Sequence, residues 1–534
     1  MDRLNGNALK AMFESGCNNL VAHKNDIDAL NVFPVPDGDT GTNMSLTFTN
    51  GVSEMNKSGS DAIPVITKTF SRGLLMGARG NSGVILSQIF RGFYQAVKEK
   101  EELGVEDVHA AFTRGKELAY KAVMRPVEGT ILTVIRESVE KAEELIKENP
   151  EMPIEEYLDA FFEASKVSLD HTPELLPVLK EAHVVDSGGS GLVKVIEGFN
   201  AYLHGNPITK VEESETSVDE VHEKSSGYRA EFVLKMNSKG KQTFNEDRVR
   251  KMLDTMGNNI TLLNDGEELK LKINTMSPGE ILTLGQRYGD FKKIQIENIQ
   301  GELSPSIIEE EVVEERKKYG IIAVSAGEGL DKIFKDYRVD VVVSGGQTMN
   351  PSTADFVEAI EKLNADNIYL LPNNSNIVMS CEQARDVTKD KNVVVLRTTS
   401  IPQGISACIS FNPDEEVEAN TEAMQEAIDY VKSGSITYAV KDTSIDGKEI
   451  KTGDYMGILN KDIVVVKQGR LETIKELLNL MIDEDSEVAT IFKGQDVEDT
   501  ECEEIRAYLE ENFDIEVDIE DGGQPVYSYY IGVE

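Results

Sequence analysis

Residues 31–45 read Asn-Val-Phe-Pro-Val-Pro-Asp-Gly-Asp-Thr-Gly-Thr-Asn-Met-Ser. Two prolines stiffen the approach, and Asp37 and Asp39 then flank Gly38, so that two carboxylates can be aimed at one point from a turn. Carboxylates placed in this way are typical of sites for hard cations such as Mg²⁺. Residues 40–43 add hydroxyls, an amide and backbone N–H groups of the kind that hold a metal-bound phosphate. Taken alone, the pattern is equally compatible with an Asx-rich surface turn.

A second glycine-rich connector spans residues 77–83 and reads Gly-Ala-Arg-Gly-Asn-Ser-Gly, just ahead of a predicted helix. Its glycines let the backbone approach a bulky anion, the helix start offers N–H groups, and Arg79 adds a forked donor. The alternative interpretation is an ordinary turn between two helices. The chain contains no GxxxxGK[ST] motif, so a nucleotide bound here would not use a P-loop.

Two more connectors of this kind precede predicted helices, at residues 125–133 and 185–191. The first contains Thr130, which is also a good helix N-cap, and the second contains Asp186 beside three glycines. Four such connectors within the first 191 residues are harder to dismiss than any one of them. If they gather at one end of a helical bundle, they form a pocket for a metal ion and a triphosphate.

The first 205 residues predict an all-α domain of about eight helices, because apolar residues recur there at helical spacing. The expected helices are 9–21, 63–75, 84–98, 108–124, 131–147, 154–168, 173–182 and 192–203. Residues 206–226 are polar and acidic and predict a linker. Residues 227–312 follow the order β-α-β-β-α-β, which indicates an α+β, ferredoxin-like middle domain. From residue 313 to 534, buried-type strands alternate with helices, which predicts an α/β C-terminal domain in two lobes.

The overall composition limits the kinds of partner. The formal net charge is −40, which argues against general nucleic-acid binding or membrane-surface binding, because either surface would repel the chain. No run of about 18 apolar residues predicts an integral membrane segment, and the N-terminus has no signal-like apolar region. The four cysteines form no CxxC pair, so the sequence indicates neither a disulfide framework nor a cysteine-built zinc site. We therefore expect a cytoplasmic protein.

The motifs at residues 30–44, 78–83 and 185–189 resemble the DhaL-type nucleotide domain of the fatty acid kinase catalytic subunits, the FakA or YloV-like family. The resemblance continues at residues 326–329, 345–352, 371–376 and 522–527. It implies an eight-helix barrel that binds ATP with two magnesium ions. It further implies transfer of the γ-phosphate to the carboxylate of a fatty acid held by a separate FakB (DegV-type) carrier, giving an acyl phosphate for phospholipid synthesis.

Carried over by position, the resemblance makes Asp37 and Asp39 magnesium ligands and, together with Arg79, catalytic residues. The residues implied to surround the nucleotide are Thr40, Gly41, Thr42, Asn43, Ser45, Gly80, Asn81, Ser82, Gly83, Thr130, Thr133, Asp186 and Gly188. DhaL domains of dihydroxyacetone kinases carry a third aspartate five residues before the first of the pair. Here the nearest counterpart is Asn31, which is neutral, and it is our candidate third metal ligand. Asp186 or the nucleotide alone is the alternative source of charge balance.

The middle domain departs from the family in a second respect. Family members often hold zinc there through a cysteine in the first strand and two histidines of a His-x-His-Thr segment. This chain has Arg229 in that strand and Lys272-Ile273-Asn274-Thr275 in place of the histidines, and its last histidine is His222. Since neither lysine nor arginine replaces imidazole or thiolate, we expect no zinc. A stoichiometric zinc in the purified protein would refute this.

Further candidates lie in the C-terminal half. Residues 350–352 and 373–376 follow predicted strand ends, where ligands bind in α/β sheets, but N-caps of the following helices are an equally good interpretation. Arg397 is a candidate contact for the carrier. The leading hypothesis is thus a carboxylate-phosphorylating kinase whose C-terminal domain docks the carrier. The alternatives are a nucleotide-sensing scaffold and a dihydroxyacetone-type kinase. Oligomeric state is left open, with a homodimer among the states considered.

Overall fold

The computed structural model describes residues 2–32, 38–210, 228–237, 241, 244, 249, 252–253, 256, 258–264, 268–275, 278–298, 316–346, 350–439, 442–445 and 448–534. Contacts divide the chain into two units, the first made of Met1–Val211 together with Glu314–Glu534 and the second of Glu212–Val313. Within the first unit we call residues 2–203 the helical domain and residues 316–534 the α/β domain. We call residues 228–298 the middle domain.

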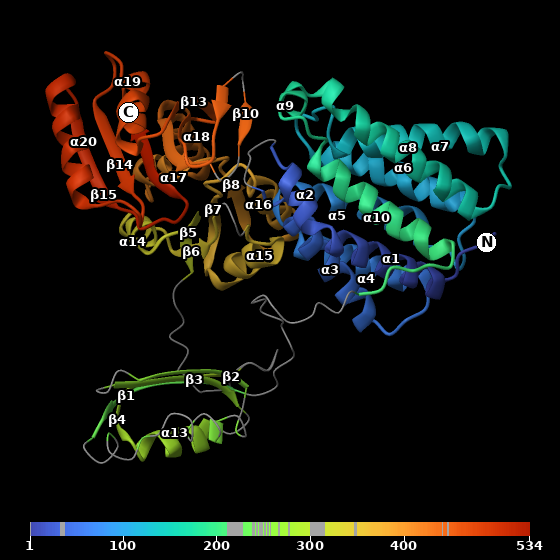
Figure 1. The fold of residues 1–534 in the computed structure, drawn as a ribbon, viewed down its shortest axis with the longest axis horizontal. Coiled ribbons are helices and arrows are strands. Elements are labelled where there is room, and N and C mark those ends of the chain that lie inside the picture. The colour runs from blue at the N-terminus through green and yellow to red at the C-terminus, as the bar shows by residue number, and fades with distance from the viewer. Residues whose placement is uncertain are drawn as a thin grey trace. The chain divides into compact units, whose positions relative to one another are not determined.

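The helical domain is an all-α bundle, as its periodicity predicts (Figure 1). Its helices are α1 (Gly6–Ala22), α2 (Lys24–Leu30), α3 (Thr40–Lys57), α4 (Ile63–Gly77), α5 (Gly80–Val97), α6 (Val105–Ala122), α7 (Ile131–Glu148), α8 (Ile154–Leu175), α9 (Pro177–Glu181) and α10 (Ser187–Leu203). Helix α1 packs on α10, α3 on α4, α5 on α6 and α7 on α8. The connectors that precede α3, α5, α7 and α10 are the four that the sequence marks as unusual.

Helices α2 and α3 are absent from the sequence expectation, and one further helix boundary differs from it. The segment from Thr40 to Asn43 is not a loop but the first turn of α3, because Asp39 is the N-cap residue and the Asn43 N–H already donates to the Asp39 carbonyl at 2.8 Å. Pro173, expected to begin a helix, lies inside the last turn of α8. There the Thr172 hydroxyl donates to the Leu169 carbonyl at 2.7 Å, a carbonyl for which proline offers no N–H.

The core of the helical domain is built on phenylalanines from several helices. Phe13 of α1 stacks on Phe70 of α4 with ring centroids 4.4 Å apart, and both rings meet Phe90 of α5 edge-on. Such aromatic pairs contribute about 0.5–1.5 kcal/mol each beyond simple burial. Helices α1 and α10 approach closely at Gly16 and Gly198, where a Cβ on Gly198 would lie 2.6 Å from the Gly16 Cα. The core therefore fixes the helix ends that carry the unusual connectors.

The first lobe of the α/β domain is a four-stranded parallel sheet in the order β6-β5-β7-β8. Its elements are β5 (Lys317–Ser325), α14 (Glu328–Asp336), β6 (Val341–Ser344), α15 (Thr353–Lys362), β7 (Ala365–Leu371), α16 (Val378–Val387), β8 (Asn392–Val395), α17 (Ile401–Ser410) and α18 (Val417–Tyr430). The chain leaves β5 toward β6 on one side and returns to β7 on the other. The crevice between the carboxyl ends of β5 and β7 is the place where doubly wound sheets bind ligands.

The second lobe is a six-stranded mixed sheet in the order β13-β12-β9-β16-β14-β15, accompanied by the β10-β11 hairpin. Its elements are β9 (Lys432–Tyr438), β10 (Thr443–Ile445), β11 (Lys448–Ile450), β12 (Tyr455–Leu459), β13 (Asp462–Lys467), α19 (Arg470–Met481), β14 (Val488–Lys493), α20 (Asp499–Asn512), β15 (Glu516–Asp521) and β16 (Tyr527–Val533). The two sheets match the two-lobed α/β expectation.

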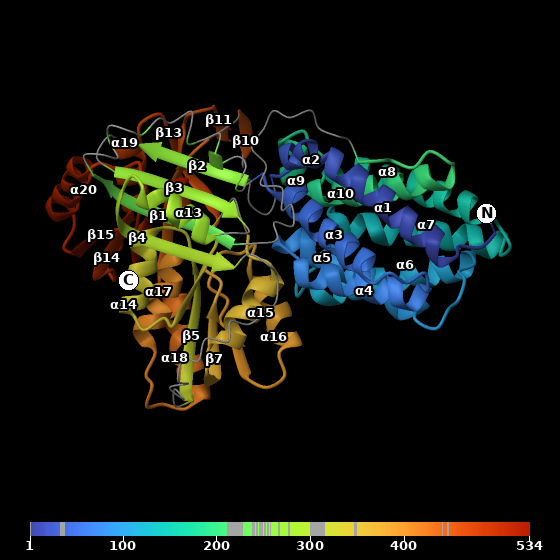
Figure 2. The same ribbon diagram turned by 90° about the horizontal axis from the view of Figure 1, so that it is seen from below.

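Helices α15 and α16 join the α/β domain to the helical domain. Helix α15 packs on α4 and α16 packs on α5, and both views show this pair beside the blue helices (Figure 1 and Figure 2). The Thr353 N–H donates to the Ala78 carbonyl at 3.2 Å, and the Gln383 side chain donates to the Leu75 carbonyl at 2.6 Å. The carboxyl edge of the parallel sheet is thereby held against the connector between α4 and α5.

The middle domain contains β1 (Tyr228–Met236), β2 (Asn258–Asn264), β3 (Glu268–Thr275), α13 (Pro278–Gln286) and β4 (Gly289–Asn298). Its strands form an antiparallel sheet in the order β2-β3-β1-β4, which is the order of a β-α-β-β-α-β module. The first helix of the β-α-β-β-α-β order, expected from the sequence at residues 246–256, falls largely outside the described residues. Across the part of the chain that the structure describes, no helix combines the length and apolar character that a membrane span requires.

Candidate functional site

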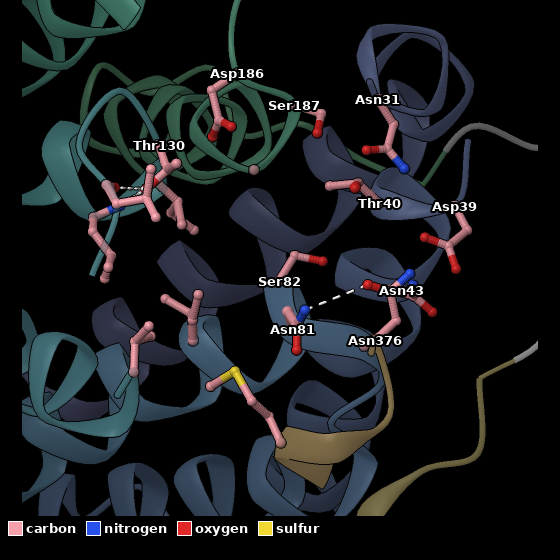
Figure 3. A pocket seen from close by; sticks show the side chains of 18 of the residues that line it. Asn31, Asp39, Thr40, Asn43, Asn81, Ser82, Thr130, Asp186, Ser187 and Asn376 are labelled. Atoms are coloured by element: carbon pink, nitrogen blue, oxygen red, sulfur yellow. Dashed lines mark hydrogen bonds between the residues drawn. The ribbon is translucent and has the colours of Figure 1, made fainter. Parts of the chain in front are cut away.

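A cavity in the first unit collects residues from all four unusual connectors (Figure 3). Its empty volume, open mouth included, is about 790 Å³. Its lining residues are Asn31, Asp39, Thr40, Asn43, Gly80, Asn81, Ser82, Ile85, Val123, Arg125, Val127, Thr130, Ile131, Leu132, Asp186, Ser187, Gly188, Asn376 and Met379. Ten of the predicted site residues are among them, and the last two lining residues come from the α/β domain.

The N-termini of four long helices meet at this cavity. Thr40 begins α3, Gly80 begins α5, Ile131 begins α7 and Ser187 begins α10, and each of these helices has 17 or 18 residues. Each start presents the positive end of a helix dipole, equivalent to about half a unit charge. The starts of α3, α5 and α10 add backbone N–H groups, whereas at α7 the N–H groups of Ile131 and Leu132 already bond Asp186 and Thr130. Gly80 adopts φ +59°, which a residue with a Cβ rarely adopts. The cavity is therefore arranged to hold an anion with several negative oxygens.

Asp186 is buried at the joint between two of these helices. Its side chain accepts the Gly189 N–H at 2.7 Å and caps α10, and it also accepts the N–H of Ile131 at the start of α7. Burial raises the pKa of Asp186 from 3.8 to about 6, although both backbone donors favour the ionised form. The carboxylate thus ties two helix starts together at the wall of the cavity.

The oxygen donors that suit a divalent cation lie on the opposite side from Thr130. Figure 3 shows Asn31, Asp39 and Asn43 grouped there, and the first two are only 2% and 8% exposed. Carboxylate, amide and hydroxyl oxygens are the ligands that Mg²⁺ prefers, so Asp39, Asn31 and Thr40 fit such an ion. Asp37 lies outside the described residues. Among the residues that are described, no cluster of three His, Cys, Asp or Glu side chains suits a metal.

Several predicted site residues do not line the cavity, because they have structural partners. The Thr42 hydroxyl donates to Asp28 Oδ2 at 2.7 Å, and its N–H donates to Asp28 Oδ1 at 3.0 Å. The Thr133 hydroxyl donates to Glu128 Oε2 at 2.5 Å and accepts the Gly129 N–H. Both side chains therefore fix the connectors from outside.

Gly41, Gly83 and Ser45 also lie behind the cavity wall rather than on it. A Cβ on Gly41 would collide with the Lys24 carbonyl, and one on Gly83 would lie 2.5 Å from the Thr47 hydroxyl. These glycines allow close packing against α2 and α3. Ser45 is 5% exposed on the second turn of α3.

Arg79, expected to donate to a phosphate, contacts the α/β domain instead. Its Nη1 donates to the Asn350 carbonyl at 2.7 Å, and its Nη2 lies 3.9 Å from the Asp355 carboxylate. Arg125, at the far connector, is the arginine that reaches the cavity lining. The residues 123–132 also supply the apolar part of the wall, together with Ile85 and Met379.

The C-terminal candidates divide between the two interpretations that the sequence left open. Ser352 is an N-cap, with a capping box to Asp355 at the start of α15. Asn350 instead donates from Nδ2 to Asp39 Oδ2 at 2.6 Å, and Asn376 accepts from Asn81 at 3.4 Å. Arg397 pairs with Glu382 within the α/β domain. Sequence spacing could not place Asn350 beside Asp39, because 311 residues separate them.

Comparison with known proteins covers the whole chain. Residues 34–201 match the DAK2 domain, residues 225–304 the middle domain of FakA-like fatty acid kinases, and residues 320–534 the C-terminal domain of the same FakA-like proteins. Protein YloV of Bacillus subtilis (strain 168) is 44% identical over 552 residues, covering 99% of both chains. An uncharacterised protein of Staphylococcus aureus (strain bovine RF122 / ET3-1) is 42% identical over 554 residues, covering 100% of both.

Among solved structures, a Thermotoga maritima protein described as having a fatty acid binding function is 13% identical, with a TM-score of 0.32. It covers 41% of this chain and 99% of that chain, a likeness too weak to bear on function. The full-length relatives, and the three domain matches that follow one another along the chain, establish the family. This chain belongs to the FakA-like family of fatty acid kinase proteins.

Proposed function

We propose that this protein is an ATP-dependent kinase that phosphorylates the carboxylate of a fatty acid held by a DegV-type (FakB) carrier. The observation that carries the proposal is the cavity where four helix N-termini face the oxygen donors of Asp39, Asn31 and Thr40. The domain architecture is that of a kinase family, which supports phosphoryl transfer as the reaction. The family's description as fatty acid kinase supports a fatty acid as the acceptor, and the carrier is carried over from the resemblance.

The cavity lining offers groups that suit each part of the proposed ATP and its cations. The helix starts at Gly80 and Ser187 bind phosphate oxygens through backbone N–H groups, and the apolar wall around Val127 and Leu132 holds the adenine. Asp39 and Asn31, with Asp37 from the same connector, would hold the two magnesium ions of the proposal. Bound magnesium supplies neutralisation of the charge that develops on the phosphates.

No general base is required for this acceptor. A carboxylic acid is ionised at neutral pH, so one carboxylate oxygen attacks the γ-phosphorus directly. The bond from that phosphorus to the β–γ bridging oxygen breaks, and ADP leaves with the electron pair. The products are an acyl phosphate and ADP. Catalysis then consists of positioning the two reactants and neutralising charge, which is what helix starts and metal ligands provide.

The decisive experiment measures ATP consumption and acyl phosphate, trapped as its hydroxamate, with purified protein, Mg²⁺ and a carrier loaded with fatty acid. We expect turnover only when the loaded carrier is present. The Asp39→Ala variant should lose turnover by about a thousandfold or more, since it removes a metal ligand, and should keep its helical circular dichroism. Full activity of this variant would show that the metal assignment is wrong.

The same assay tests the alternatives. A nucleotide-sensing scaffold, favoured by the neutral Asn31 where related kinases have aspartate, would bind ATP and consume none. A dihydroxyacetone-type kinase would consume ATP with its small substrate and without a carrier. We also propose that the middle domain works without zinc, which elemental analysis of the purified protein would test.

A further inference from the structure

Asn350 belongs to the α/β domain, yet its side chain contacts the cation site of the helical domain. Its Nδ2 donates to Asp39 Oδ2 at 2.6 Å, and the Asn350 side chain is 1% exposed. Asp39 lines the cavity, whereas Asn350 stands behind it. The contact therefore reaches the cavity through Asp39.

The chemistry of the two groups fixes the orientation of the amide. An ionised carboxylate can only accept hydrogen bonds, so the NH₂ group of Asn350 must face Asp39 and the amide oxygen must face away. That oxygen is buried and has no hydrogen-bond partner among the described residues. A buried acceptor left unsatisfied is uncommon. The hydrogen bond to Asp39 therefore sets the orientation of this amide.

The surroundings hold Asn350 in place from both domains. Its backbone carbonyl accepts a hydrogen bond from Arg79 Nη1 at 2.7 Å. Three residues later, the Thr353 N–H donates to the Ala78 carbonyl. A Cβ on Gly80 would lie 2.8 Å from Asn43 Nδ2 and 3.5 Å from Asn350 Nδ2. Glycine at position 80 thus leaves room for both amides beside the carboxylate.

We propose that Asn350 is a positioning residue through which the α/β domain orients Asp39 for its cation, so that the helical domain alone has an incomplete site. The inference rests on the proposed function, since it assumes that Asp39 binds magnesium. Groups that hydrogen-bond a metal-binding carboxylate fix its direction, and their loss typically weakens metal binding by about 10–100-fold. Arg79, which holds the Asn350 backbone, acts in the same chain of contacts.

The test uses the full-length protein and follows its melting temperature as Mg²⁺ is titrated, alone and with ADP. Asn350→Ala removes the donor, and Asn350→Asp places a second carboxylate against Asp39. Asn420→Ala is the matched control, because Asn420 is also 1% exposed and makes two hydrogen bonds of 2.8 Å, both to Asn412 within the α/β domain. All three variants lose buried hydrogen bonds, but only two of them touch Asp39.

The Mg²⁺ midpoint is the Mg²⁺ concentration that gives half of the maximal rise in melting temperature. We expect Asn350→Ala to raise this midpoint by about tenfold or more, whereas Asn420→Ala should lower the melting temperature without changing the midpoint. Asn350→Asp should melt earlier in EDTA, because two carboxylates repel, and should show a lower Mg²⁺ midpoint than wild type, because a cation relieves that repulsion. A purely structural role would not move the two variants in opposite directions. An unchanged midpoint in Asn350→Ala, or a shift of both variants in the same direction, would overturn the inference. A wild-type protein that Mg²⁺ and ADP do not stabilise would instead refute the proposed function.

Discussion

The buried carboxylate of Asp186 predicts an unusual pH dependence of stability. Its pKa is about 6 in the folded chain, against 3.8 as the ordinary value. A carboxyl group whose pKa is raised on folding binds protons more readily in the folded state. Its contribution to stability is therefore fully present below about pH 4 and is lost as the pH rises through about pH 6. Asp186→Asn keeps an oxygen that caps α10 and removes this titration.

The size of the effect follows from the shift in pKa. A shift from 3.8 to about 6 corresponds to roughly 3 kcal/mol between fully protonated and fully ionised Asp186, since each unit is worth about 1.4 kcal/mol. Roughly half of this is already lost at about pH 5, so the further loss between about pH 5 and about pH 7.5 is roughly 1–2 kcal/mol. For a helical domain of this size, that equals a melting temperature shift of about 3–5 °C.

Thermal melts followed by circular dichroism, in EDTA and without nucleotide, measure the effect directly. The melting temperature of Asp186→Asn should rise relative to wild type as the pH rises from about 5 to about 7.5, because only wild type ionises a buried carboxyl group in this range. Thr42→Ser, which keeps the bond to Asp28, serves as a control with no altered titration. A difference that stays constant with pH, or that falls, would contradict the burial and pKa argument.

Two further substitutions separate cavity residues from structural ones. Asn31→Asp should lower the Mg²⁺ concentration needed for half-maximal binding, because it adds a negative charge among the oxygen donors, and should weaken nucleotide binding in the absence of metal. Calorimetric titration would measure both affinities. Affinities equal to those of wild type would remove Asn31 from the site. Thr42→Val should lower the melting temperature, since it loses a hydrogen bond to Asp28 worth about 1 kcal/mol, and should leave ATP turnover unchanged. A large loss of turnover would instead place Thr42 in the phosphate site.

Local pattern predicts the class of each part of the chain, because periodicity and helix starts depend on neighbouring residues. The helices that carry Phe13, Phe70 and Phe90 and the alternating α/β order are seen as expected, whereas α2 and α3 are not predicted. The pattern fails where a short helix or an interior proline is involved. Helix α2 is only seven residues long, and α3 begins immediately after the turn at Asp39, so polar residues at its start conceal its period.

The sequence predicts that the four connectors come together at one cavity, but it does not predict which side chains point into that cavity. Thr40 and Thr42 have the same chemistry and lie two residues apart, and only the first faces the cavity. On a helix, two residues apart means about 200° around the axis, so a loop interpretation could not distinguish them. Asn350 is a candidate because of its strand end, but its partner across the domain contact depends on tertiary packing that the sequence does not display.

The charge of the cavity accounts for its mixture of aspartates and asparagines. Four helix N-termini and Arg125 contribute at most about +3 in total, and the carboxylates of Asp39 and Asp186, with that of Asp37 in the proposed cation site, contribute about −3 when all are ionised, so these groups nearly balance. A third aspartate at position 31 would favour the cation but repel the phosphates whenever the cation is absent. Because Asn31 and Asn350 are neutral, they can bind or orient through oxygen and N–H groups without adding that repulsion. Because Asn350 belongs to the α/β domain, the orientation of the Asp39 carboxylate depends on the contact between the two domains.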